Sequence, residues 1–231
     1  MGKANTTLIF ANTHATRDLK EIVSGSPNHT FSFPLTIVVI REHAFCAKFD
    51  LRSVRLNEGL ETLGAHSFEE SGLRTLILPA SVSSVGASAF AKCEHLEHVD
   101  LRNAIRLNCL GENAFRSCKA LRNALLGDGM QIISHSCFKE SGLEKMDLPH
   151  GVEYIRSHAF EGCSSLRHVN AATSALKTVK EYSFHKSGLE EFVAPPSLYM
   201  IGYAAFSKCT RLWFVDLSKC LADGSEDDVE V

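Results

Sequence analysis

A phenylalanine preceded by a small residue recurs through most of this chain at an almost constant interval. Successive members of the series are separated by 23, 22, 25, 23, 22, 24 and 22 residues. The eight anchors are Phe45, Phe68, Phe90, Phe115, Phe138, Phe160, Phe184 and Phe206. Self-similarity at a period of about 20–29 residues indicates a solenoid of stacked coils. This feature therefore constrains the fold more strongly than any other in the chain.

Each anchor lies in a unit where apolar residues hold fixed positions. An aliphatic residue lies five positions before the phenylalanine, and a leucine five or six positions after it opens the pattern L-x-x-Φ-x-Φ, where Φ is apolar. This alternation predicts a strand with one buried face. Pro79, Pro149 and Pro195 directly follow three of these strands, where pairing should stop. One unit cannot bury its apolar face alone, so we expect neighbouring coils to stack with parallel strands about 4.8 Å apart.

Two units carry the repeat in full, Ser84–Leu96 (SVGASAFAKCEHL) and Tyr154–Leu166 (YIRSHAFEGCSSL). In these residues the chain resembles the BspA-like leucine-rich repeats, and the resemblance extends over residues 37–217. The units around Ser71, Ser141 and Ser187 depart from it, with serine in place of cysteine and a turn one residue shorter. The resemblance implies a curved, β-rich solenoid that binds other macromolecules. It also implies a surface or adhesion role in microbes, and it brings no catalytic residue.

The predicted fold class is a β-rich α/β solenoid. It is a leucine-rich-repeat superhelix of about eight coils of 22–25 residues, with a parallel sheet on its concave face. The segment around each phenylalanine is too short for more than one or two helical turns. Residues 1–36 are expected to contain a degenerate capping coil, and residues 37–217 form the solenoid. Residues 218–231 are expected to be a disordered tail, because five of the last nine residues are acidic.

Composition and charge narrow the class of partner. The net charge is −3 and no basic block occurs, so nucleic-acid binding is not expected. No run of 18 apolar residues exists, so no membrane span is expected. No signal-peptide core is visible, which favours the cytoplasm, whereas the resemblance favours the cell surface. The first six residues match the loose myristoylation pattern, so lipidation of Gly2 and an ordinary N-terminus both stay open.

The cysteines follow the repeat. Four of the eight occupy one position, namely Cys93, Cys118, Cys163 and Cys209, where other units have serine or Lys48. That substitution pattern is typical of a small packing residue in a tight turn. No C-x-x-C pair is present to build a zinc site, so we expect no metal. We also expect no cofactor. Cys93 and Cys118 lie on adjacent coils, so a disulfide between them is an alternative to free thiols.

The histidines also sort by their place in the unit. His43, His66 and His158 lie two residues before an anchor, where we expect hydrogen-bonded surface positions. His98 and His168 point outward from strands that are three coils apart. Strand spacing puts about 14 Å between them, which is too far for one metal or one catalytic pair.

Outward positions on the strands are the candidate binding residues, because the inward positions form the core. They are His98, Asp100, Asn123, Leu125, Lys145, Asp147, His168, Asn170, Glu191, Val193 and Phe214. Stacking is expected to place Lys145, His168 and Glu191 side by side. No nucleophile accompanies the histidine, so no catalytic residue is expected. A mixture of polar and apolar side chains is typical of protein interfaces, and a solvated sheet face is the alternative.

The last strand, Leu212–Leu217, contains the only tryptophan, and no cap is evident beyond it. A solenoid end without a cap makes end-to-end self-association one further expectation. The favoured function is a non-enzymatic module that binds another protein on the concave sheet, as a scaffold or as a surface or adhesion protein. The alternative is a regulatory or targeting fragment of a larger multidomain protein.

Overall fold

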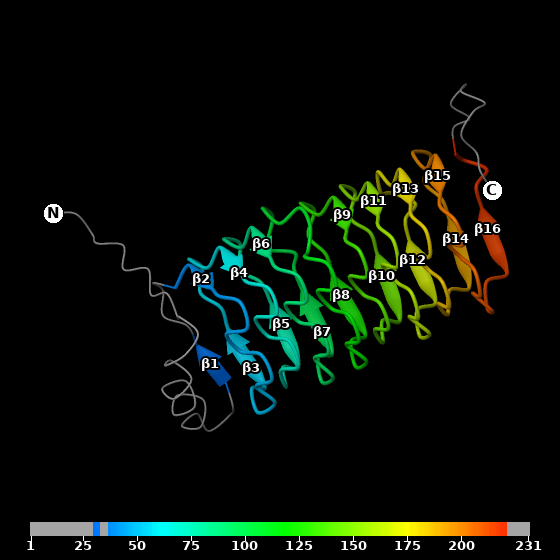
Figure 1. Ribbon diagram of the computed structural model, residues 1–231. Helices are drawn as coiled ribbons and strands as arrows, with labels where there is room; N and C mark the ends of the chain where they lie inside the picture. Colours follow the sequence, from blue (N-terminus) through cyan, green and yellow to red (C-terminus); the bar gives the residue numbers. More distant parts are fainter. Residues whose placement is uncertain (1–29, 33–36, 221–231) are drawn as a thin grey trace.

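The computed structural model describes residues 30–32 and 37–220. These residues form about eight coils stacked along one axis, from β1 at one end to β16 at the other (Figure 1). Every strand pairing among them is parallel. No helix occurs in this part of the chain, so the α component of the predicted fold class is not present there.

Three-residue strands form the main ladder, which crosses the front of the molecule in Figure 1. They are β1 (Thr30–Ser32), β3 (Ser53–Arg55), β5 (Thr75–Ile77), β7 (His98–Asp100), β8 (Asn123–Leu125), β10 (Lys145–Asp147), β12 (His168–Asn170), β14 (Glu191–Val193) and β16 (Phe214–Asp216). The ladder is divided into separate sheets between β3 and β5 and between β8 and β10. Backbone hydrogen bonds bridge both divisions, from Arg74 N to Arg52 O at 3.1 Å and from Glu144 N to Arg122 O at 3.3 Å. The ladder is therefore continuous from coil to coil.

Two-residue strands form a second ladder along another side of the coils (Figure 1). They are β2 (Val39–Ile40), β4 (Thr62–Leu63), β6 (Ser84–Val85), β9 (Ile132–Ile133), β11 (Tyr154–Ile155), β13 (Thr178–Val179) and β15 (Met200–Ile201). The fourth coil contains Cys109, which lies within the longest interval between phenylalanines, from Phe90 to Phe115. On this side it contributes only an isolated bridge from Cys109 to Ile132. The longer unit thus interrupts the regular pairing on this side.

The backbone around each phenylalanine forms tight turns in place of the predicted helical turn. It enters the left-handed region two residues before and two residues after the anchor, as at His43 (φ 57°) and Ala47 (φ 56°). In these turns, alternate backbone N–H groups donate hydrogen bonds to carbonyl oxygens of the next coil. Phe45 N donates to Ser67 O at 2.7 Å, and Ala47 N donates to Glu69 O at 2.8 Å. A helical turn would direct those N–H groups within its own segment. The bonds between coils therefore favour turns.

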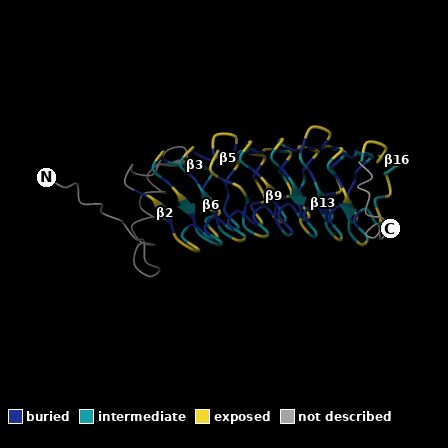
Figure 2. Ribbon diagram, turned by 90° about the horizontal axis from the view of Figure 1, so that it is seen from above, coloured by how far each residue is buried: buried dark blue, intermediate teal, exposed yellow. Residues whose placement is uncertain are grey.

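The phenylalanines stack inside the coils as one column. Neighbouring ring centroids lie 5.0 to 5.6 Å apart, and their planes differ by only 4° to 7°. Buried residues line the interior along the whole length of the coils, and exposed residues lie at the outer bends (Figure 2). Phe206 in the last coil is only partly buried, unlike the seven anchors before it. No further coil covers it within the described residues.

All eight cysteines are free thiols, so the disulfide interpretation for Cys93 and Cys118 is wrong. Cys93 Sγ donates to the carbonyl oxygen of Phe68 at 3.1 Å and lies 3.3 Å from Ser71 Oγ, while Cys118 Sγ donates to Phe90 O at 3.1 Å. Each thiol therefore donates its hydrogen to a carbonyl oxygen of the preceding coil. Burial raises the pKa of Cys93 to about 11, which keeps the thiol protonated and unreactive.

Candidate functional site

The outward side of the three-residue strands, which we call the strand face, carries the candidate residues in two columns. Lys145 lies opposite His168, and His168 lies opposite Glu191, so these three side chains follow one another in the first column. Asp147 lies opposite Asn170 in the second column. The predicted juxtaposition of the lysine, the histidine and the glutamate is thus present in the register of the sheet.

The same two columns continue toward both ends of the molecule. His98 pairs with Asn123, and Asp100 pairs with Leu125, on β7 and β8. Toward the other end, Glu191 pairs with Phe214. All eleven candidate residues lie on the one ladder of three-residue strands, because the Glu144–Arg122 hydrogen bond joins its two halves.

The strand face mixes exposed apolar groups with charges. Ile77 is 62% exposed, Leu125 39% and Phe214 42%. Arg102, which the sequence did not indicate, lies just beyond β7 and holds Asp100 with two bonds: Nε to Oδ1 at 3.0 Å and Nη2 to Oδ2 at 2.7 Å. These bonds lower the pKa of the Asp100 carboxyl. The strand face therefore presents a carboxylate held in a fixed orientation by Arg102, together with exposed apolar side chains.

Within residues 30–32 and 37–220, no group of three or more histidine, cysteine or acidic side chains could hold a metal ion. No helix in the same residues is long and apolar enough to cross a membrane. His168 Nδ1 lies 3.5 Å from Glu191 Oε1, and both side chains are about half exposed. Both groups are therefore open to solvent on the strand face.

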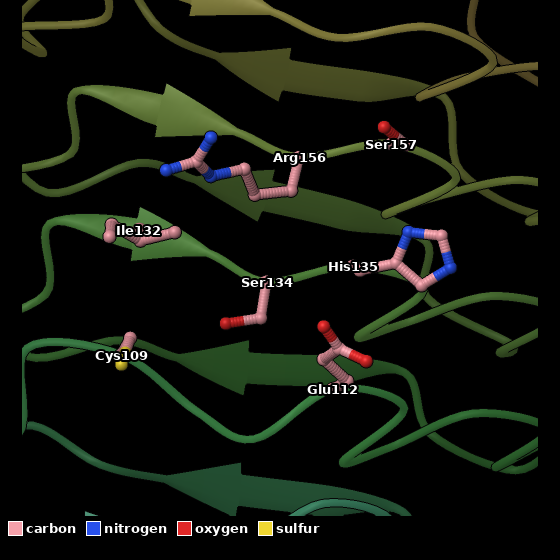
Figure 3. Close-up of a pocket in the computed structure, with 7 residues that line it drawn as sticks. All are labelled: Cys109, Glu112, Ile132, Ser134, His135, Arg156 and Ser157. Carbon is pink, nitrogen blue, oxygen red and sulfur yellow. The ribbon is translucent and has the colours of Figure 1, made fainter.

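A pocket of about 440 Å³ opens on the side of the two-residue strands, where the fourth coil breaks the regular pairing. The residues that line it are Cys109, Glu112, Ile132, Ser134, His135, Arg156 and Ser157. In Figure 3 the Arg156 side chain and the His135 ring point in opposite directions. Arg156 instead lies over the ring of Tyr154, with its guanidinium carbon 5.4 Å from the ring centroid.

The pocket was not predicted, because its residues belong to three coils and none of them stands out in its own unit. The imidazole of His135 packs edge-on against His158, with centroids 5.3 Å apart. Figure 3 places Cys109 away from His135, so the two do not form a nucleophile and its base. The pocket therefore brings side chains of three coils together without a cysteine–histidine pair.

Two matching clusters of histidine, glutamate and lysine lie at the phenylalanine turns. In one, Glu69 is 2.7 Å from His66 Nδ1 and 3.3 Å from Lys92 Nζ. In the other, Glu161 is 2.6 Å from His158 Nδ1 and 2.7 Å from the ammonium of a lysine on the preceding coil, Lys139. The spacing H-x-x-E at both places is visible in the sequence, but the lysines come from neighbouring coils.

These contacts predict a loss of stability in acid. Burial alone would raise the pKa of the Glu161 carboxyl, but hydrogen bonds from Lys139 and His158 outweigh it, so the pKa lies below the ordinary 4.5. The unfolded chain therefore takes up the proton first. The stabilisation is present above about pH 4.5 and is lost as the pH falls through the lowered pKa of the folded state. We expect each cluster to contribute up to about 1 kcal/mol.

Urea unfolding measured between about pH 6 and pH 3 tests this expectation. Glu161→Gln should lower the stability near pH 6 and flatten its decline below pH 4.5. Glu58→Gln serves as the control, because Glu58 is exposed and belongs to neither cluster. An unchanged pH profile for Glu161→Gln would remove the cluster as the cause.

The chain matches known proteins in sequence pattern and in structure. The model of the BspA type leucine rich repeat region matches residues 24–123 and 105–213, in six copies. No curated protein matches the chain. The T. pallidum leucine rich repeat protein is 22% identical with a TM-score of 0.56, and the match covers 80% of this chain and 78% of that chain.

Two further solved structures are similar. A leucine rich cell surface protein from Faecalibacterium prausnitzii is 17% identical with a TM-score of 0.48, and the match covers 84% of this chain and 70% of that one. A leucine-rich repeat protein from Bacteroides ovatus is 19% identical with a TM-score of 0.43, and the match covers 78% and 58%. This chain thus spans little more than half of the Bacteroides protein. At these identities the likeness concerns the fold alone. Because the family model matches most of the sequence, the chain belongs to the BspA-type leucine-rich repeat family.

Proposed function

We propose that this chain is a non-enzymatic binding module that docks another protein on its strand face. The observation that carries the proposal is the ladder of Lys145, His168 and Glu191 in register, with exposed Ile77 and Leu125 on the same face. Aligned charges give a partner orientation, and the apolar side chains on the preceding coils supply contact area. Leucine-rich repeat proteins typically serve as surface or protein-interaction modules, which agrees with this use.

Two finer points belong to the proposal. The strand face is expected to line the concave side of the solenoid, where a partner would contact several coils at once. The role is expected to be that of a scaffold or of a surface or adhesion protein.

Charge reversal on the strand face tests the proposal. The double variant Lys145→Glu with Glu191→Lys inverts the first column around His168. A partner recovered with the intact chain from its native organism is titrated against this variant. We expect at least a tenfold loss of affinity, because reversed charges at a contact oppose the partner's own charges.

The matched control is Glu153→Lys with Lys177→Glu, on the side of the two-residue strands. Lys177 Nζ lies 2.9 Å from Glu153 Oε2, and the exchange keeps this ion pair while reversing its direction. It should leave the affinity unchanged. Equal loss in both variants, or loss in the control alone, would move the docking surface away from the strand face.

A further inference from the structure

The last described coil exposes side chains that the other coils bury. Val215 is 41% exposed and Leu217 is 44% exposed, whereas the residues at the same positions one coil earlier, Phe192 and Ala194, are at most 1% exposed. Trp213, the only tryptophan of the chain, is 73% exposed beside them. The core of the solenoid therefore opens onto its surface at β16, which lies at one end of the molecule in Figure 1.

The backbone of this end is also unpaired on its outer side. Ala194, one coil before β16, donates its N–H to Asp216 O at 2.9 Å. The hydrogen-bonding need of this N–H is thus met by the coil that contains β16. Leu217 holds the equivalent position in the last coil, and no residue in the described part of the chain accepts from its N–H. An open strand edge with apolar side chains is a template for pairing with another strand. At the opposite end of the ladder, β1 pairs with β3.

We propose that two copies of the chain associate tail to tail through β16, as an antiparallel strand pair across a two-fold axis. A two-fold axis perpendicular to the strands makes the residue on the axis face its own copy. With Val215 on the axis, Trp213 lies opposite Leu217 of the second copy. Phe214 then lies opposite Asp216 of the second copy.

This register is self-complementary in chemistry as well as in geometry. It joins Trp213, Val215 and Leu217 in three apolar cross-strand pairs, the kind of contact that stabilises a sheet. It sets no like charges directly opposite each other, since Asp216 faces an aromatic ring. A tail-to-tail contact occupies the β16 edge of both copies, so assembly stops at the dimer. Pairing of β16 with β1 of another copy would leave one free edge at each end and would continue into a filament.

The contact area of one coil end is small beside a standard interface of about 1,600 Å². We therefore expect a dimer that dissociates in the micromolar range. Sedimentation velocity of the 231-residue chain from about 1 to 300 µM should give a monomer–dimer equilibrium. Val215→Lys brings two like charges together at the axis and should weaken the dimer at least tenfold.

Ile105→Lys is the matched control, because Ile105 is an exposed apolar residue that lies between β7 and β8, outside the strand face and far from β16. It should leave the equilibrium unchanged. Circular dichroism of both variants establishes that they are folded. Trp213→Ser provides a second, milder variant that removes a side chain from the surface and should also weaken the dimer.

A cross-link gives a positive readout of the register. In Val215→Cys, oxidation by diamide should join two copies through the new thiols, and peptide mass spectrometry should locate that disulfide. The unaltered chain under the same oxidant controls for the native cysteines. A monomer at every concentration, assembly beyond the dimer, or a dimer that tolerates Val215→Lys would overturn the proposal. The substituted residues Val215 and Trp213 are not among the strand-face candidates, so failure of the dimer would leave the docking proposal standing.

Discussion

Replacing Phe115 with alanine is expected to lower the free energy of unfolding by about 3–5 kcal/mol and to broaden or split the unfolding transition. Phe115 is fully buried, and its ring lies 5.4 Å from that of Phe90 and 5.5 Å from that of Phe138. Each coil contacts only its neighbours, so the cavity weakens two interfaces in the middle of the stack. The two halves can then unfold separately.

Urea unfolding followed by two signals measures this effect. Circular dichroism reports on all the strands, whereas the emission of Trp213 reports on the last coil alone. The two midpoints should separate in Phe115→Ala and coincide more closely in the unaltered chain. Phe206→Ala is the matched control, because Phe206 is already partly exposed and ends the column. We expect it to cost less, and equal, fully cooperative losses at both sites would contradict the picture of independent coils.

Substitution of Gly142 by alanine is expected to cost about 1–3 kcal/mol or more. A Cβ at this position would lie 2.1 Å from the carbonyl oxygen of Lys119 and 2.9 Å from its carbonyl carbon. Both are backbone atoms of the preceding coil, so neither can move aside without shifting a turn. Gly142 N also donates to Cys118 O at 3.1 Å, which fixes the approach of the two coils.

Gly162→Ala serves as the comparison. It tests the cost of a left-handed backbone without the close approach to a neighbouring backbone that is present at Gly142. Gly162 has a φ of 71°, and its added Cβ would meet the Glu140 side chain at 3.2 Å, a contact that can relax. We expect a cost of about 1 kcal/mol, the penalty for a left-handed residue. Thermal unfolding of both variants compares the two costs. Equal destabilisation would mean that the close approach at Gly142 is not what the glycine provides.

In the short units, the sequence shows a serine–cysteine alternation and the structure shows the contact that accounts for it. Ser71, Ser141 and Ser187 replace cysteine in turns that are one residue shorter, and this alternation is plain in the sequence. The physical reason for the alternation is not visible in the sequence. Ser141 Oγ lies 3.4 Å from the sulfur of Cys163 on the next coil, so the serine of one unit contacts the cysteine of another. The contact joins residues 22 positions apart in the chain. A pattern within one unit cannot reveal it.

The turns at the phenylalanines differ from prediction for a related reason. Local spacing allowed one or two helical turns, and nothing within a unit opposes them. The N–H groups of these turns bond to the following coil, as Phe45 does to Ser67, so the choice between helix and turn is made between units. The same holds for Lys92 and Lys139, which complete their clusters from neighbouring coils.

The coil period, the column of phenylalanines and the order of side chains on the strand face could all be predicted from the amino-acid sequence. Each of these follows from a pattern that every unit repeats, and burial of the apolar side chains enforces that pattern. The left-handed turns, the Asp100–Arg102 pair, the pocket at Cys109 and the exposed edge at Val215 were established by the three-dimensional packing. They depend on which residues meet across a coil interface, and the edge depends on β16 having a neighbouring strand on only one side within the described residues.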